Sequence, residues 1–188
     1  RRFRRGRYQS TTKTGQISPY DRIIRHYAQR YQFDWRLMAA QAYVESRFDP
    51  NAKSRVGALG LFQVMPRTGR SLGFTKLADP AQGTHAGIKY MHRLLGRFDP
   101  DLPLQERVYF ALAAYNAGLG HVHDARRLAR RLGKDPDRWF ENVEAAMLKL
   151  SEPEYARQAR HGYCRGGQPV AYVRHIQEKY EAYVKLAR

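Results

Sequence analysis

The sequence predicts an all-α fold, a single compact helical domain, and three observations indicate this class. Apolar residues recur with the helical period along most of the 188-residue chain, no segment alternates as a strand would, and no internal repeat is present. Hydrophobic residues make up 43% of the chain and aromatic residues 12%, which excludes a disordered chain. We expect the folded domain over residues 18–188, after a basic linker at residues 1–17 that leads from an upstream domain.

Two helices are predicted at the start of the domain. Ser18 is suited to the N-cap of the first helix, with Pro19 at the first helical position. The second helix is predicted over residues 34–46, where apolar side chains follow the helical period. The turn residues at 49–51 and the glycines that follow predict a loop, and a short element after it is expected to end near Thr68.

Five longer helices are predicted in the rest of the chain. They are expected at residues 81–98, 107–116, 121–132, 135–150 and 172–186. The segment 107–116 is apolar nearly all round, so its helix is expected at the centre of the fold. Gly118 and Gly120 are expected to end that helix.

The chain is strongly basic, with 34 Lys and Arg against 17 Asp and Glu and a net charge of +17. This charge predicts a preference for polyanions or acidic surfaces. The basic residues are spread over the predicted helices rather than gathered in one block, so a solvated basic face, nucleic acid, an anionic wall polymer and phospholipid headgroups all fit. No apolar run approaches the roughly 18 residues of a membrane-spanning helix.

The residues that bind metals give no pattern of a site. Cys164 is the single cysteine, which excludes an intrachain disulfide and a multi-cysteine metal site, and with no base identifiable beside it we expect an inert thiol. The seven histidines show no metal-ligand spacing. We therefore expect neither a metal nor a cofactor.

Glu45 is the first candidate for chemistry. On a helix it lies three residues after Ala42 and seven after Met38, at the edge of the apolar stripe. Partial desolvation there raises the pKa of a carboxyl, and a pKa of about 6 would let Glu45 deliver a proton at neutral pH. Periodicity alone leaves open the alternative of a solvated glutamate near a helix end.

Three motifs in a fixed order add to this candidate. They are Glu45-Ser46, the block Gly60-Leu61-Phe62-Gln63-Val64-Met65-Pro66, and the block Ala114-Tyr115-Asn116-Ala117-Gly118. Together they resemble the catalytic domain of the soluble-type lytic transglycosylases, a branch of the goose-type lysozyme-like fold, although many relatives have methionine in place of Phe62. Four later segments, 120–126, 135–139, 161–166 and 170–173, together make the chain similar to the membrane-bound lytic transglycosylase F family, from about residue 18 to the C-terminus.

The resemblance implies cleavage of the β-1,4 bond between N-acetylmuramic acid and N-acetylglucosamine in peptidoglycan without water, which leaves 1,6-anhydromuramoyl ends. Glu45 matches the single catalytic residue of the family, which acts first as acid and then as base. Most glycosidases need two carboxylates. Here the sugar supplies its own nucleophile, and we interpret Asp49 as a residue of the turn before Pro50 rather than as a second catalytic carboxylate.

Six further residues are candidates for substrate contacts or positioning roles in the reaction that the resemblance implies: Ser54, Gln63, Met65, Tyr115, Asn116 and Tyr172. Ser54 matches the position that contacts an acetamido group, but it is equally suited to cap a turn. Gln63 is expected to bind a sugar, with a structural hydrogen bond as the alternative.

Met65 offers an apolar surface to a sugar ring or fills the core. Tyr115 and Asn116 end the central helix, where their side chains can point into a groove, unless Asn116 only caps that helix. Tyr172 matches a tyrosine whose hydroxyl lies near the acid, and its alternative is a core tyrosine at a helix start.

The expected partners and location follow from the resemblance alone. They are peptidoglycan glycan strands and muropeptides, and a solute-binding-like regulatory domain at the N-terminal side of the full-length chain. The resemblance implies the periplasm of a Gram-negative bacterium, with peripheral outer-membrane association through regions outside this sequence, and no nucleic acid. Two alternatives stay open: a hydrolytic goose-type muramidase, and a non-enzymatic basic module that binds cell wall or nucleic acid.

Overall fold

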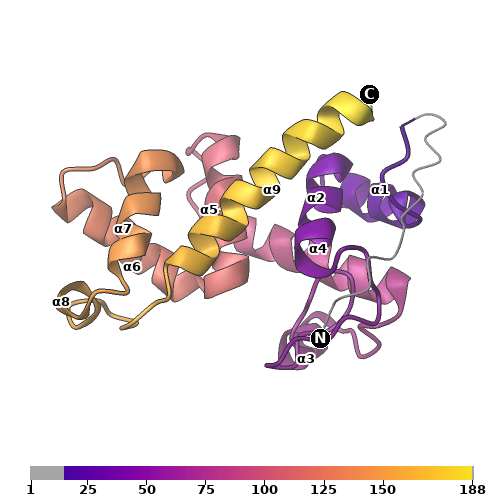
Figure 1. Cartoon of the computed structure of the whole chain (residues 1–188), viewed down its shortest axis with the longest axis horizontal. Helices are drawn as coiled ribbons and strands as arrows, with labels where there is room; N and C mark the ends of the chain where they lie inside the picture. Colours follow the sequence, from indigo (N-terminus) through magenta and orange to yellow (C-terminus); the bar gives the residue numbers. More distant parts are fainter. Residues whose placement is uncertain (1–14, 188) are drawn as a thin grey trace, which may run out of the picture.

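Residues 15–187 are described in the computed structural model, and this part of the chain folds into helices joined by loops, of which the one between α2 and α3 is long (Figure 1). In chain order these are α1 (Asp21–Arg30), α2 (Trp35–Ser46), α3 (Pro66–Leu72), α4 (Pro80–Leu95), α5 (Leu104–Ala117), α6 (Leu119–Arg131), the π-helical turn η1 (Trp139–Val143), α7 (Glu144–Lys149), α8 (Pro153–Ala156) and α9 (Gly167–Leu186). Among the described residues, β structure is limited to isolated bridges in the loop between α2 and α3. The all-α class is confirmed.

Helix α5 lies at the centre of the fold, as its apolar composition predicts. Its residues 109–114 are all buried, and it packs against α4, α6 and α9. In Figure 1, α9 runs diagonally across α5, with α1 to α4 towards one end of the molecule and α6 to α8 towards the other. The long C-terminal helix therefore connects the two ends of the bundle.

Helix α2 is held against α9 near its N-terminal end. Asp34 caps α2 by accepting a hydrogen bond from the backbone N–H of Arg36 (2.9 Å), and it forms an ion pair with the Arg36 side chain. The same carboxylate accepts a hydrogen bond from the hydroxyl of Tyr180 on α9 (2.8 Å). This contact fixes where the C-terminal end of α2 lies relative to the earlier turns of α9.

The start of α1 differs from the prediction. Ser18 is not the N-cap and Pro19 is not the first helical residue, because α1 begins at Asp21 with Tyr20 as its cap. The carboxylate of Asp21 accepts hydrogen bonds from the backbone N–H groups of Ile17 and Ser18 and from the Ser18 hydroxyl, each 2.8 Å long. These bonds, together with the one that the Ser18 hydroxyl accepts from the backbone N–H of Tyr20 (3.1 Å), close a turn before the helix, and no side chain caps α1.

The predicted helix over residues 135–150 is also wrong in its first part. The π-helical turn η1 and then α7 occupy this region, and Phe140 and Glu141 have non-helical backbone angles. The carboxylate of Glu106 on α5 accepts a hydrogen bond from the backbone N–H of Trp139 (2.7 Å), and the Trp139 side chain is fully buried. A tertiary contact therefore fixes this segment where periodicity predicts a regular helix.

Smaller differences concern helix ends. Gly118 follows α5 as predicted, but Gly120 lies inside α6 and does not end a helix. Helix α4 ends at Leu95 rather than at residue 98, α5 and α9 begin earlier than predicted, and α8 is not predicted at all. The short element expected to end near Thr68 is α3, which continues to Leu72.

The linker predicted at residues 1–17 lies mostly outside the described residues. Ile17, which is described, is buried in the core and belongs to the folded part of the chain. Among the described residues, no helix combines the length and the apolar character that crossing a membrane requires.

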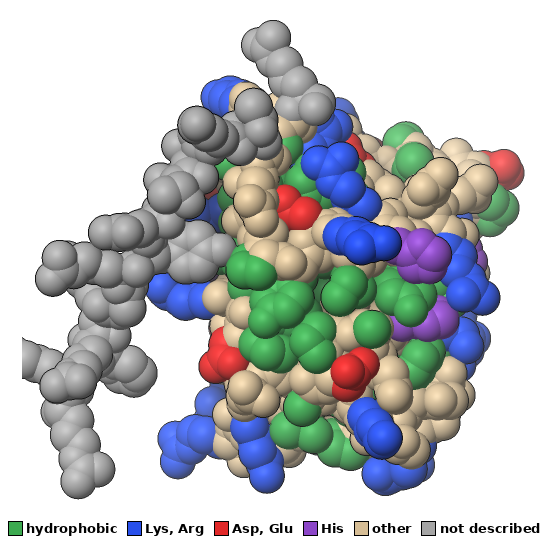
Figure 2. Space-filling model, turned by 90° about the vertical axis from the view of Figure 1, so that its right-hand side faces the viewer, with side chains coloured by type: hydrophobic (Ala, Val, Ile, Leu, Met, Phe, Trp, Pro, Cys, Tyr) green, Lys and Arg blue, Asp and Glu red, His purple; other side chains and the backbone are tan. Residues whose placement is uncertain are grey.

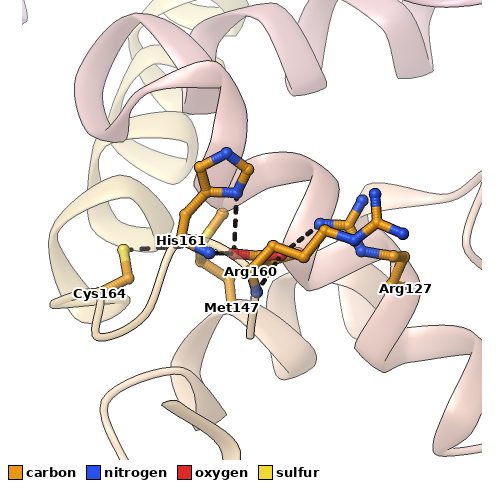
Figure 3. A network of polar contacts seen from close by, with 6 residues as sticks. Arg127, Met147, Arg160, His161 and Cys164 are labelled. Carbon is orange, nitrogen blue, oxygen red and sulfur yellow. Dashed lines mark hydrogen bonds and ion pairs between the residues drawn. The ribbon is translucent and has the colours of Figure 1, made fainter. Parts of the chain in front are cut away.

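The loop before α9 is fixed by one buried acid on α6. Asp124 accepts hydrogen bonds from the backbone N–H groups of Arg160 (3.1 Å) and His161 (2.7 Å). The side chains of His161 and Arg127 contact the same carboxylate, as Figure 3 shows. Burial alone would raise the pKa of Asp124, but the hydrogen bonds from His161, Arg127 and Arg160 outweigh it and hold this pKa below its ordinary value of 3.8.

Candidate active site

Glu45 lies in the last turn of α2, half-buried, and faces α9. The hydroxyl of Tyr172, itself buried, donates a hydrogen bond to Glu45 Oε1 at 2.6 Å. Burial raises the pKa of Glu45 from its ordinary value of 4.5 to about 7, and the hydrogen bond from Tyr172 offsets only part of this effect. At neutral pH the carboxyl is therefore divided between its acid and base forms, which does not fit a solvated glutamate at a helix end.

Tyr115 brings the central helix α5 to the same place. Its hydroxyl donates to the backbone carbonyl of Phe62 (2.6 Å), and its ring interacts electrostatically with Glu45. Burial raises the pKa of both Tyr115 and Tyr172 well above the ordinary value of 10.0, so both hydroxyls keep their protons at neutral pH. Two neutral phenols, from α5 and α9, thus interact with the titratable carboxyl that α2 carries.

Ser46, the second residue of the Glu-Ser pair, connects α2 to the loop between α2 and α3. Its Oγ lies 3.1 Å from the carbonyl oxygen of Ala42 and 2.9 Å from that of Leu61. In the sequence, Ser46 stands out only as part of a motif. The structure gives it the role of holding the loop beside Glu45.

Gln63 and Ser54 both stabilise that loop. The Gln63 amide nitrogen donates to the carbonyls of Ala52 (3.0 Å) and Gly60 (2.9 Å), and the residue adopts a left-handed backbone conformation. The Ser54 hydroxyl accepts a hydrogen bond from the backbone N–H of Ala58 (2.9 Å). Gln63 therefore makes the structural hydrogen bonds, and Ser54 the turn contact, that were the alternatives to sugar binding. These bonds do not use Oε1 of Gln63 or the hydroxyl proton of Ser54.

Two further candidates lie at the surface. Met65, just before α3, is 40% exposed, so the alternative of a core filler is wrong. Asn116 is exposed in the last turn of α5, and the C-cap of that helix is Gly118, so Asn116 does not cap it. Both side chains are therefore accessible to a ligand.

Asp49 behaves as a residue of the turn. It is exposed, and its Oδ1 accepts a hydrogen bond from the backbone N–H of Asn51 (2.9 Å). This contact agrees with the interpretation of Asp49 as a turn residue.

Gln41 is a part of the site that the sequence analysis does not include. It lies one turn before Glu45 on α2, is fully buried, and donates a hydrogen bond through Nε2 to the Tyr172 hydroxyl (3.0 Å). The available signal in the sequence is an amide within an otherwise apolar run, Met38-Ala39-Ala40-Gln41-Ala42.

Among the described residues, the side chains of metal-binding type do not form a second site. Figure 2 shows Lys and Arg side chains scattered over one face, with hydrophobic and His side chains among them. His85 of α4 stacks on Tyr27 of α1, and burial lowers the pKa of the His85 imidazole. Within residues 15–187 no group of three or more His, Cys, Asp or Glu side chains is placed to hold a metal ion. Cys164 is buried, and burial raises the pKa of its thiol.

Comparisons with known proteins show the family of this chain. The chain matches the Transglycosylase SLT domain over residues 22–137. It is 42% identical over 165 residues to the membrane-bound lytic murein transglycosylase F of Alcanivorax borkumensis and 40% identical over 167 residues to that of Marinobacter nauticus. These alignments cover 88% and 89% of this chain but 35% and 33% of the relatives, so the chain spans about a third of their length.

Solved structures with the same fold include the soluble lytic transglycosylase SLT70 of Escherichia coli, with a TM-score of 0.60 and 24% identity over 88% of this chain and 24% of that one. The lytic transglycosylase Slt of Pseudomonas aeruginosa gives a TM-score of 0.59 and 21% identity, over 90% of this chain and 25% of that one. The resemblance to the membrane-bound lytic transglycosylase F family is thereby confirmed, and the chain belongs to the Transglycosylase SLT domain family.

Proposed function

We propose that this chain cleaves the β-1,4 bond between N-acetylmuramic acid and N-acetylglucosamine in peptidoglycan without water, and that Glu45 is its catalytic residue. The observation that carries the proposal is the raised pKa of the Glu45 carboxyl together with its hydrogen bond from Tyr172. Its pKa is about 7 and Tyr172 holds one of its oxygens, so a single side chain can give up a proton and take one back at neutral pH.

In the first step Glu45 acts as an acid. The neutral carboxyl gives its proton to the glycosidic oxygen as the bond from this oxygen to C1 of the muramoyl residue breaks. The leaving sugar departs with a neutral hydroxyl, and positive charge develops at C1. The carboxylate left behind is stabilised by the hydrogen bond from Tyr172, and the N-acetyl group of the substrate itself can stabilise C1.

In the second step the same carboxylate acts as a base. It takes the proton from the C6 hydroxyl of the muramoyl residue while the C6 oxygen forms a bond to C1. The product is a 1,6-anhydromuramoyl end, and Glu45 is protonated again. Protons therefore balance over the cycle without a water molecule and without a second carboxylate, unlike the paired carboxylates of most glycosidases.

The remaining candidates would hold the glycan. We assign Ser54 to an acetamido group and Gln63 Oε1 to a sugar hydroxyl, because the loop hydrogen bonds of both side chains leave these groups for a ligand. Met65 and Asn116 are exposed and would contact sugar rings. Tyr115 would position the loop through its bond to a backbone carbonyl.

The expected partners are peptidoglycan strands and muropeptides, to whose carboxylate-rich stems the charge of +17 is suited. Relatives three times as long carry the name of a membrane-bound enzyme. We therefore propose a periplasmic protein associated peripherally with the outer membrane, in which a solute-binding-like regulatory domain precedes this one.

Digestion of purified sacculi tests the function. The chain should release muropeptides with anhydro ends, which mass spectrometry finds one water lighter than reducing ends, and Glu45→Gln should abolish the release while the fold is kept. Glu154→Gln, which changes an exposed glutamate on α8, is the matched control and should act as wild type. Reducing ends would instead identify a hydrolytic muramidase, and full activity of Glu45→Gln would overturn the role of Glu45.

A further inference from the structure

Gln41 occupies a position where an apolar side chain would be expected. It is fully buried on α2, with alanines before and after it. Its Nε2 donates to the Tyr172 hydroxyl, but its Oε1 has no hydrogen-bond partner among the described residues. A buried amide that is only half satisfied destabilises a fold relative to an apolar side chain of the same shape. Stability therefore gives no reason for an amide at this position.

The direction of the hydrogen bonds does give a reason. Gln41 Nε2 can only donate, so the Tyr172 oxygen accepts from it at 3.0 Å, and the single hydroxyl proton of Tyr172 is free to point to Glu45 Oε1 at 2.6 Å. Each bond in such a chain polarises the next one and strengthens it. The three side chains thus form a directed chain that begins in the core and ends on one oxygen of the carboxyl.

We propose that Gln41 is a positioning residue that determines which oxygen of Glu45 carries the proton. With Oε1 held as an acceptor, the proton of the neutral carboxyl lies on Oε2, the oxygen left for the substrate. Gln41 touches no reacting atom and acts only through Tyr172. This inference rests on the proposed role of Glu45 as acid and base.

The groups around Glu45 allow the influence of Gln41 on the titration of Glu45 to be measured separately. The titratable groups that interact with Glu45 are Tyr172 from α9 and Tyr115 from α5, and burial keeps both neutral at the pH values of interest. Gln41→Met keeps the size of the side chain and changes no charge. Any change in the titration of Glu45 in this variant therefore reports on the hydrogen bond to Tyr172.

The test compares Gln41→Met, Tyr172→Phe and the double variant. Met38→Leu, fully buried on the same helix, is the matched control. Release of anhydromuropeptides gives kcat and KM, thermal melting gives stability, and NMR of ¹³C-labelled glutamate carboxyls gives the titration midpoint of Glu45 without substrate. We expect Gln41→Met to melt no lower than wild type, to lose about tenfold in kcat, and to titrate Glu45 at a higher pH. In the Tyr172→Phe background it should have no further effect on kcat or midpoint.

An unchanged kcat and midpoint in Gln41→Met would overturn the proposal. So would a loss of equal size in the Tyr172→Phe background, because Gln41 would then act independently of Tyr172. A lower melting temperature with an unchanged midpoint would indicate a purely structural role and would also overturn it. Failure of the proposed function is a different result, namely wild-type chain that releases no anhydro product, and the NMR titration still decides the role of Gln41 in that case.

Discussion

Replacing Glu45 by glutamine is expected to stabilise the folded chain at neutral and alkaline pH. The pKa of Glu45 rises from 4.5 to about 7 on folding because the carboxyl is buried. An unfolded chain therefore ionises this residue at a lower pH than the folded chain does. Between these two values the unfolded state binds fewer protons, so the stability of the wild type falls as the pH increases.

The size of the effect follows from the two pKa values. Since one pKa unit corresponds to about 1.4 kcal/mol, keeping an ionised Glu45 in the folded chain costs about 3 kcal/mol above pH 7. Glutamine has nearly the same shape, offers Oε1 to Tyr172, and does not ionise. The advantage of Glu45→Gln should be near zero at pH 4, grow through the range from 4.5 to 7, and reach about 3 kcal/mol at pH 8, a rise in melting temperature of roughly 6–12 °C.

Urea unfolding of both chains at unit steps from pH 4 to pH 8 measures this difference. Glu154→Gln is the control, because its exposed carboxylate lies in water in the folded chain as well as in the unfolded one. Parallel stability curves for wild type and Glu45→Gln, or an advantage that is largest at pH 4, would refute the reasoning that Glu45 is ionised at a cost.

Three further substitutions test the scaffold around the site. Gly87→Ala places a Cβ 2.3 Å from the Cβ of Phe62, so α4 and the loop between α2 and α3 must separate. Thermal melting should show a loss of about 2 kcal/mol in the free energy of unfolding. Wild-type stability would mean that this contact is not tight. Tyr115→Phe leaves the Phe62 carbonyl without its donor; we expect a loss of about 1–3 kcal/mol in urea unfolding and lower activity on sacculi, and unchanged values would remove Tyr115 from the site. Asp124→Asn should lower the free energy of unfolding by about 2 kcal/mol at pH 7, because hydrogen bonds from His161 and other donors hold the pKa of Asp124 below 3.8. The difference in stability between wild type and variant should shrink as the pH falls below 3.8. A difference that instead grew on acidification would contradict this assignment.

The fold class and the central position of α5 could be predicted from the amino-acid sequence. A helical apolar period identifies α2 and its stripe, and the apolar composition of residues 109–114 requires a central α5, because burial is decided by composition and periodicity. The order of three short motifs indicates the family, which the matching domain over residues 22–137 confirms. Glu45 becomes a candidate through both sources together, because periodicity alone leaves a solvated glutamate open and the motifs add the catalytic role.

The hydrogen bonds around Glu45 and those that hold the loops depend on how the helices pack. Tyr172 reaches Glu45 across 127 positions of the chain, and Gln41 enters the site only because α9 lies along α2. The bond from Glu106 to Trp139 replaces a regular helical start by a π-helical turn in the same way. Hydrogen bonds between residues far apart in the chain leave no periodic trace in the sequence. The family resemblance therefore suggests Tyr172 beside Glu45, but Gln41 and the bond from Trp139 to Glu106 are seen only when the helices are packed.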